Sequence, residues 1–159
     1  MAALELRLFI RATPERVWDV LSDLPGQIRW MEDLRSLEFT SDQQSGSGTV
    51  IKVTSELFRL PLVHEVMEIT TWQPPNRLGV RHSGGFNGTG EVIIEPAPGG
   101  SVFTWREVFE PPLGPVGELG FKLIVGPHMR SVFKRSMENV RRLAEEAQSS
   151  MTKPSGSLT

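Results

Sequence analysis

The sequence predicts an α+β domain in which a curved, seven-stranded antiparallel sheet wraps around one long C-terminal helix. Three observations lead to this prediction. Residues 116–147 have a helical pattern, residues 34–109 alternate like strands and are broken by short turns, and two short helical segments follow the first strand. Such a sheet can bury its inner face against a single helix only by curling around it.

The long helix is predicted from apolar residues at steps of three or four. These are Phe121, Val125, Met129, Val132, Ser136, Val140 and Leu143, and the opposite face is charged. Pro127 lacks a backbone donor and clashes with the carbonyl four residues earlier, so we expect a kink or break there. The part before Pro127 is either a weak roof over a space between sheet and helix, able to open for ligand entry, or merely an irregular helix start.

The N-terminal region is predicted as a strand followed by two short helices. Apolar residues alternate with mostly charged ones at 4–11: Leu4, Leu6, Leu8 and Ile10 against Glu5, Arg7, Phe9 and Arg11. This alternation indicates a half-buried strand with the leucines inward. Thr13 is the expected N-cap and Pro14 the first residue of a helix that ends at 22–26. Residues 27–32 form the second short helical segment and carry Trp30.

Six further strands are predicted in residues 34–109. The first begins at Leu34 and includes Leu37 and Phe39, and the others span 50–57, 62–72, 78–82, 88–95 and 102–109. The short connections indicate an antiparallel meander. Residues 1–147 are therefore expected to form one domain, and the small polar residues 148–159 a disordered tail.

Composition excludes several classes of function. The net charge of −2 and pI of about 5.9 leave no basic field for nucleic acid, and the absence of cysteine excludes thiolate chemistry. The N-terminus lacks the apolar core of a signal peptide, and no run approaches the roughly 20 apolar residues of a membrane span. We therefore expect a cytoplasmic protein without a nucleic-acid partner or membrane span.

Several local sequences resemble the superfamily of START, Bet v 1 and polyketide cyclase/dehydrase proteins (SRPBCC). They are ATPERVWDVLSD at 12–23, Trp30, PPNRL at 74–78 and GGSVFTW at 99–105. The resemblance covers residues 2–146 and implies the helix-grip fold, with a cavity between sheet and helix. Members hold lipids, sterols, plant hormones or polyketides there, and a minority catalyse cyclisation or dehydration. The lack of cysteine excludes the Rieske cluster of some relatives.

Glu107 and His82 are the candidate catalytic residues. Trp105, Glu107 and Phe109 share one face of the last predicted strand, which we expect to face the cavity. A buried carboxylate needs a partner, and His82 or an arginine could supply it. The pair could perform general acid–base catalysis or be a satisfied structural pair. Arg81 or Arg106 would enter only if the strand faces were reversed.

The other polar candidates carry weaker signals. His64 and Glu65 point to opposite faces of a strand, and the apolar pattern favours Glu65 inward, although a bulge could reverse this. His128 lies close to the apolar stripe of the long helix, either at the surface or in the cavity. The three histidines lack metal-ligand spacing, and residues 83–90 form a glycine-rich hairpin without the ending of a phosphate-binding loop, so no metal or cofactor is expected.

The favoured function is binding of an apolar or amphipathic small molecule between sheet and helix. A cofactor-independent cyclase or dehydratase using Glu107 and His82 is the first alternative, and a protein-interaction module without a ligand is the second. The expected ligand-binding residues are Trp30, Val53, Val80, His82, Val92, Ile94, Trp105, Glu107, Phe121, Val125, His128 and Val132.

Overall fold

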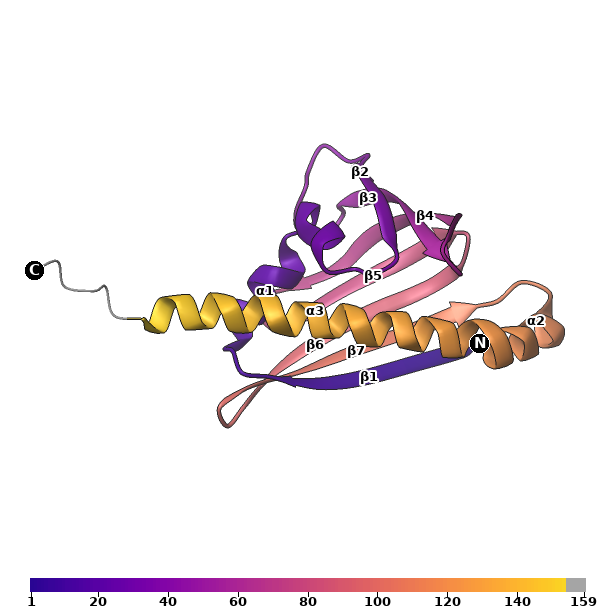
Figure 1. The fold of residues 1–159 in the computed structure, drawn as a ribbon. Coiled ribbons are helices and arrows are strands. Elements are labelled where there is room, and N and C mark those ends of the chain that lie inside the picture. Colours follow the sequence, from indigo (N-terminus) through magenta and orange to yellow (C-terminus); the bar gives the residue numbers. More distant parts are fainter. Residues whose placement is uncertain (154–159) are drawn as a thin grey trace, which may run out of the picture.

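The computed structural model describes residues 1–153 and consists of a curved sheet wrapped around a long helix (Figure 1). The seven antiparallel strands are arranged in the order β1-β7-β6-β5-β4-β3-β2. The β1–β7 pairing joins strands distant in sequence, and the other neighbours are consecutive, as in the predicted meander. The strands are β1 (Ala2–Ile10), β2 (Leu34–Phe39), β3 (Val50–Leu57), β4 (Leu60–Gln73), β5 (Arg77–Gly84), β6 (Asn87–Ala97) and β7 (Gly100–Glu110).

Two short helices interrupt the chain between β1 and β2. Helix α1 (Pro14–Ser22) begins after Thr13, as predicted, and buries Val17, Trp18 and Leu21. The 3₁₀ helix η1 (Pro25–Arg29) follows and leads to Trp30, which is buried. Both helices cover one end of the sheet, and α1 also packs against the long helix.

The C-terminal helix has three consecutive segments: α2 (Gly114–Gly120), the π-helical turn η2 (Phe121–Val125) and α3 (Gly126–Thr152). Backbone angles are helical at the junctions Gly120, Val125 and Gly126, so the helix is continuous. In the π turn the Gly126 N–H donates to the Phe121 carbonyl, five residues earlier. The predicted irregularity at Pro127 is therefore a widened turn directly before the proline.

The face of α3 toward the sheet is wider than the predicted stripe. Phe133 and Met137 are buried beside the predicted residues, and Val140 and Ser136 have no exposed surface. Ser136 Oγ also accepts a hydrogen bond from the Glu32 N–H at 3.0 Å, which joins the helix to the segment after η1. One face of α3 is thus buried from Met129 to Ala144.

The predicted start of the tail was wrong. Helix α3 continues to Thr152, and Gln148 Oε1 accepts a hydrogen bond from the Thr13 N–H at 3.2 Å. This hydrogen bond therefore joins the extra C-terminal turn of α3 to the N-terminus of α1. Residues 154–159 of the predicted tail lie outside the described residues.

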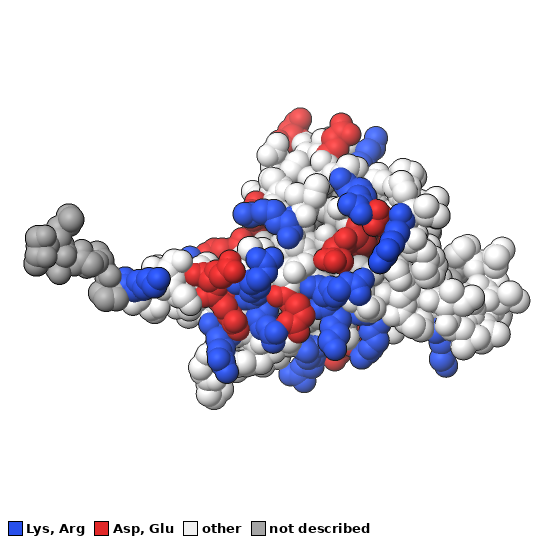
Figure 2. Space-filling view, viewed as in Figure 1, with Lys and Arg blue, Asp and Glu red and all other residues white. Residues whose placement is uncertain are grey.

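The expectation that the helix before Pro127 roofs a cavity does not fit α2. This segment buries none of its side chains, and the end of the molecule at α2 carries few charges in Figure 2, in contrast to the mixed charges over α3. The apolar outer surface is larger than the sequence indicated. Its exposed residues near α2 are Leu113, Val116, Leu119, Leu123 and Ile124.

The helix–sheet contact predicts that Val140→Asp unfolds the domain. Val140 is fully buried, and an unpaired carboxylate there should lower the free energy of unfolding by more than about 4 kcal/mol. Ala147→Asp, on the exposed face of the same helix, introduces the same charge and serves as the control. Urea unfolding followed by circular dichroism measures both variants, and equal stabilities would contradict the packing.

Candidate functional site

A partly open cavity lies between the concave face of the sheet, η1 and the middle of α3. Most of its wall is apolar, contributed by the inward faces of strands β2 to β7 and by Met129 and Phe133 of α3. The space open to the centre of a water molecule is about 70 Å³. A slender ligand fits this space better than a bulky one.

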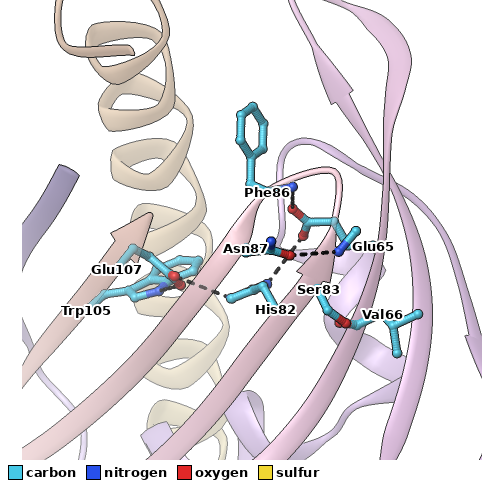
Figure 3. A network of polar contacts seen from close by, with 9 residues as sticks. Glu65, Val66, His82, Ser83, Phe86, Asn87, Trp105 and Glu107 are labelled. Carbon is cyan, nitrogen blue, oxygen red and sulfur yellow. Dashed lines mark hydrogen bonds and ion pairs between the residues drawn. The ribbon is translucent and has the colours of Figure 1, made fainter. Parts of the chain in front are cut away.

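Three ionisable side chains from three different strands meet in this wall (Figure 3). His82 of β5 lies between Glu65 of β4 and Glu107 of β7, with Nδ1 3.3 Å from Glu65 Oε2 and Nε2 3.3 Å from Glu107 Oε2. These are ion-pair distances, but neither contact has the alignment of a good hydrogen bond. His82 is thus held by charge on both sides. We call Glu65, His82 and Glu107 the ionic triad.

Each carboxylate of the ionic triad is also fixed by a hydrogen bond to a neighbour. Glu107 Oε1 accepts from Trp105 Nε1 at 2.7 Å, and Glu65 Oε1 accepts from the Phe86 N–H at 3.2 Å. The Trp105 ring in turn stacks on Phe133 of α3, with centroids 4.6 Å apart. The polar cluster is therefore connected to both the β5–β6 turn and the long helix.

Gly90 makes the contact between β7 and β5 possible. Strand β6 lies between them, and Gly90 of β6 is paired with Glu107 on one side and Val80 on the other. A Cβ atom at Gly90 would lie 2.4 Å from Glu107 Oε1 and 2.8 Å from Val80 Cγ2. The Glu107 side chain therefore extends over β6 through the space that only glycine leaves.

The two carboxylates determine the charge of His82. Burial lowers the pKa of an imidazole, but the contacts with Glu107 and Glu65 outweigh burial and raise the pKa of His82 to about 10. His82 is therefore an imidazolium at neutral pH. This charge stabilises the fold fully below pH 6.5, and the contribution is lost as the pH rises toward 10.

Asp33, between η1 and β2, is a further buried acid in the cavity wall. Burial raises its pKa to about 6, assisted by the negative charges of Glu65, Glu107 and Glu56 and opposed by its own backbone hydrogen bond. Because this pKa is above the ordinary value of 3.8, ionisation of Asp33 destabilises the fold as pH rises through 6. The Asp33 Oδ1 atom has no hydrogen-bond partner among the described residues.

The structure brings together seven of the twelve residues predicted to bind the ligand. Trp30, Val53, Val80, His82, Val92, Trp105 and Glu107 line the cavity, and the expectation that Glu65 faces inward is also met. His64 points the other way and contacts Thr54 Oγ1 through Nδ1 at 3.1 Å. Arg81 and Arg106 form exposed ion pairs with Glu68 and Glu5, so neither enters the cavity.

Five predicted residues lie away from the cavity. Ile94 and Val132 are buried in the surrounding core, and Val125 is half-buried outside the wall. Phe121 packs on Phe109 and Phe86 behind it, with centroids 5.1 and 6.0 Å away.

His128 is the fifth of these residues. It lies near the surface, where its ring packs on Phe58 at the β3–β4 turn with centroids 4.5 Å apart. The Phe58 N–H also donates to His128 Nε2 at 3.4 Å. His128 therefore joins this hairpin to the long helix and does not face the cavity.

Sequence reasoning missed Asp33, Gln27, Phe86, Met129 and Phe133 as wall residues. Met129 was recognised as part of the helix stripe, and Phe133 lies one residue after Val132, so a wider stripe would have included both. Asp33 lies in the irregular connection between η1 and β2, and Gln27 lies in η1, which is too short for a periodic pattern to indicate its direction. Among residues 1–153 no cluster of three or more side chains is arranged to bind a metal ion.

The fold and cavity define a helix-grip protein, and comparison with known proteins agrees. The model of the family described as polyketide cyclase/dehydrase and lipid transport matches residues 1–145, so the chain belongs to that family. Membership supports a role in binding hydrophobic ligands. A search of curated proteins found no match. No helix in the described part of the chain is long and apolar enough to cross a membrane.

Solved structures establish the same fold at low sequence identity. TTHA0849 from Thermus thermophilus is 21% identical with a TM-score of 0.77, and DR_A0006 from Deinococcus radiodurans is 24% identical with a TM-score of 0.66. Both alignments cover 92% of this chain and 99% of the other. Ara h 8.0201 is 18% identical with a TM-score of 0.65, covering 94% and 98%. Together with the family match, these structures place the chain in the SRPBCC superfamily.

The close approach at Gly90 predicts that Gly90→Ala disturbs the ionic triad. The added methyl group overlaps the Glu107 carboxylate, so we expect a loss of about 1–3 kcal/mol in the free energy of unfolding. Gly120→Ala is the control, because no described atom lies within 4 Å of its Cβ position in the helix. That change should stabilise slightly. Equal effects in thermal unfolding would show that the space at Gly90 is not needed.

The charge on His82 predicts a distinct NMR titration. With the pKa raised to about 10, the imidazole nitrogens of His82 should keep imidazolium shifts from pH 6 to 8. His82→Gln assigns the signals by their loss. It should also remove part of the stability decrease that the wild type shows between pH 7 and 10. A His82 titration midpoint near 6.5 would contradict the double ion pair.

Proposed function

We propose that the protein binds an apolar or amphipathic small molecule in the cavity between sheet and α3. The proposal is carried by the composition of the cavity wall, which is mostly apolar and includes a few buried polar groups. Binding sites for small molecules commonly have this composition, because apolar contacts supply affinity and polar groups orient the ligand. The family, described by cyclisation, dehydration and lipid transport, supports the same class of ligand.

The second candidate is a cofactor-independent cyclase or dehydratase that uses Glu107 and His82. The ionic triad favours it, since a histidine between two carboxylates can move protons in a low-dielectric site. However, general acid–base catalysis is most efficient when a group titrates near the working pH. His82, with its pKa raised to about 10, is a poor base at neutral pH, and Glu107 is engaged by both His82 and Trp105. This arrangement supports an anchoring role over a catalytic one.

Native mass spectrometry of freshly purified protein tests the binding proposal. We expect a mass adduct of a small amphipathic molecule that dissociates on denaturation. Val53→Phe narrows the cavity and should reduce the adduct, whereas Val50→Phe, which does not line the cavity and lies on the same strand, should retain it. A wild type that never carries an adduct and binds no apolar probe would contradict the proposal.

Turnover and affinity measurements on Glu107→Gln separate the two candidates. In a carrier the variant changes affinity alone. In a cyclase or dehydratase it should lower turnover of poly-β-keto or hydroxy-ketone substrates by ~10²-fold or more, because the exchange keeps the shape and removes the proton-accepting group.

A further inference from the structure

We propose that the cavity selects a single-chain amphiphile whose polar end is an amine, and that it discriminates against the matching carboxylate. This inference rests on the proposed function and specifies the chemical class of its ligand. It is based on the charges in the wall and on the buried polar atoms that lack a partner.

The cavity wall carries more negative charges than nearby cations can balance. Five carboxylates line it, and His82 is the only basic residue among residues 1–153 that does. Two of the five have arginine partners outside the cavity, Glu56 with Arg35 and Glu91 with Arg77. The other three are Asp33, Glu65 and Glu107. His82 is shared by Glu65 and Glu107, so one positive charge faces two negative ones, and Asp33 adds another.

Asp33 is the group best placed to receive a cation. It is 8% exposed, and in the described part of the chain it forms no ion pair and its Oδ1 atom has no hydrogen-bond partner. A buried, unpaired carboxylate is costly for the fold, and a cation at hydrogen-bond distance removes that cost. An ammonium group from the ligand would supply both the charge and the missing donor.

The other buried polar atoms without hydrogen bonds also favour a ligand whose polar end donates hydrogen bonds. Apart from Asp33 and the His82 ring, the described cavity wall has three buried polar atoms without a hydrogen bond: Gln27 Oε1, Glu107 Oε2 and Trp30 Nε1. The first two are acceptors, and Trp30 Nε1 is a donor. An ammonium has three donors and no acceptor, and therefore matches the acceptors. A carboxylate would find the indole N–H and the His82 ring, whose N–H groups already face Glu65 and Glu107 at 3.3 Å. It would also face the negative charges of Asp33 and Glu107, and like charges in a low dielectric repel strongly.

The rest of the cavity fits a single chain. Its apolar wall includes Leu21, Leu34, Val53, Val63, Met67 and Leu78, while the open volume of about 70 Å³ leaves little room for a ring system. The cavity is partly open to solvent, so the far end of a longer chain can extend outward. Polar recognition then occurs beside Asp33 and the ionic triad, which line the cavity.

Isothermal titration calorimetry with decylamine, decanol and decanoate tests the proposal at pH 7.5, below the concentrations at which they aggregate. The three probes share one chain and differ in the polar end. We expect decylamine to bind about tenfold more tightly than decanol, and decanoate to bind most weakly. Asp33→Asn should reduce the preference for decylamine over decanol from about tenfold to less than about twofold.

Two controls separate site binding from attraction to an acidic protein. Asp19→Asn removes a surface carboxylate that pairs with Arg16, and it should leave all three affinities unchanged. Val53→Phe should weaken all three. Decanoate binding as tightly as decylamine, or an amine preference that survives in Asp33→Asn, would overturn the inference while leaving the proposed function intact. Binding of none of the probes would overturn both.

Discussion

The double ion pair of His82 is the interaction on which the interior of this protein depends. It connects β4, β5 and β7 across the concave face, and it requires Gly90 on β6 to leave space for the Glu107 side chain. Trp105 extends the connection, because its indole N–H donates to Glu107 while its ring stacks on Phe133 of the long helix. The charged groups are therefore part of the packing between sheet and helix.

Burying these charges lowers the free energy of unfolding that a small domain can reach. Buried ion pairs often contribute little net stability, because desolvation offsets the attraction between the charges. Here the balance is less favourable still, since one imidazolium faces two carboxylates and the buried Asp33 carboxyl lies nearby. Apolar residues of similar size would stabilise the domain better. The retained charges make sense as recognition groups that a ligand completes.

Much of this structure follows from sequence patterns that a single strand or helix determines. The alternation in β7 places Trp105, Glu107 and Phe109 on one face, and the same rule directs Glu65 inward and His64 outward. Residues whose position depends on contacts between elements were harder to predict from the sequence. The π turn before Pro127 and the packing of Phe58 on His128 keep Val125 and His128 out of the cavity.

The meeting of Glu65 and Glu107 on His82 also exceeds what strand patterns can predict. Alternation identifies the face of each residue, but the contact depends on strand register and on the gap at Gly90, which are properties of the assembled sheet. Asp33 lies in an irregular connection, where no periodicity indicates whether a side chain is buried. The most informative acid of the site was therefore the one that sequence patterns could not identify.

A crystal structure of the complex with decylamine tests the central claim most directly. If the charged wall of the cavity is a recognition site, the amine nitrogen will lie within hydrogen-bond distance of the Asp33 carboxylate, and the chain will pass between Val53 and Phe133. The contradicting result is a chain bound elsewhere, for example on the exposed apolar residues near Leu119, or one whose amine points outward while the buried carboxylates keep only their present neighbours.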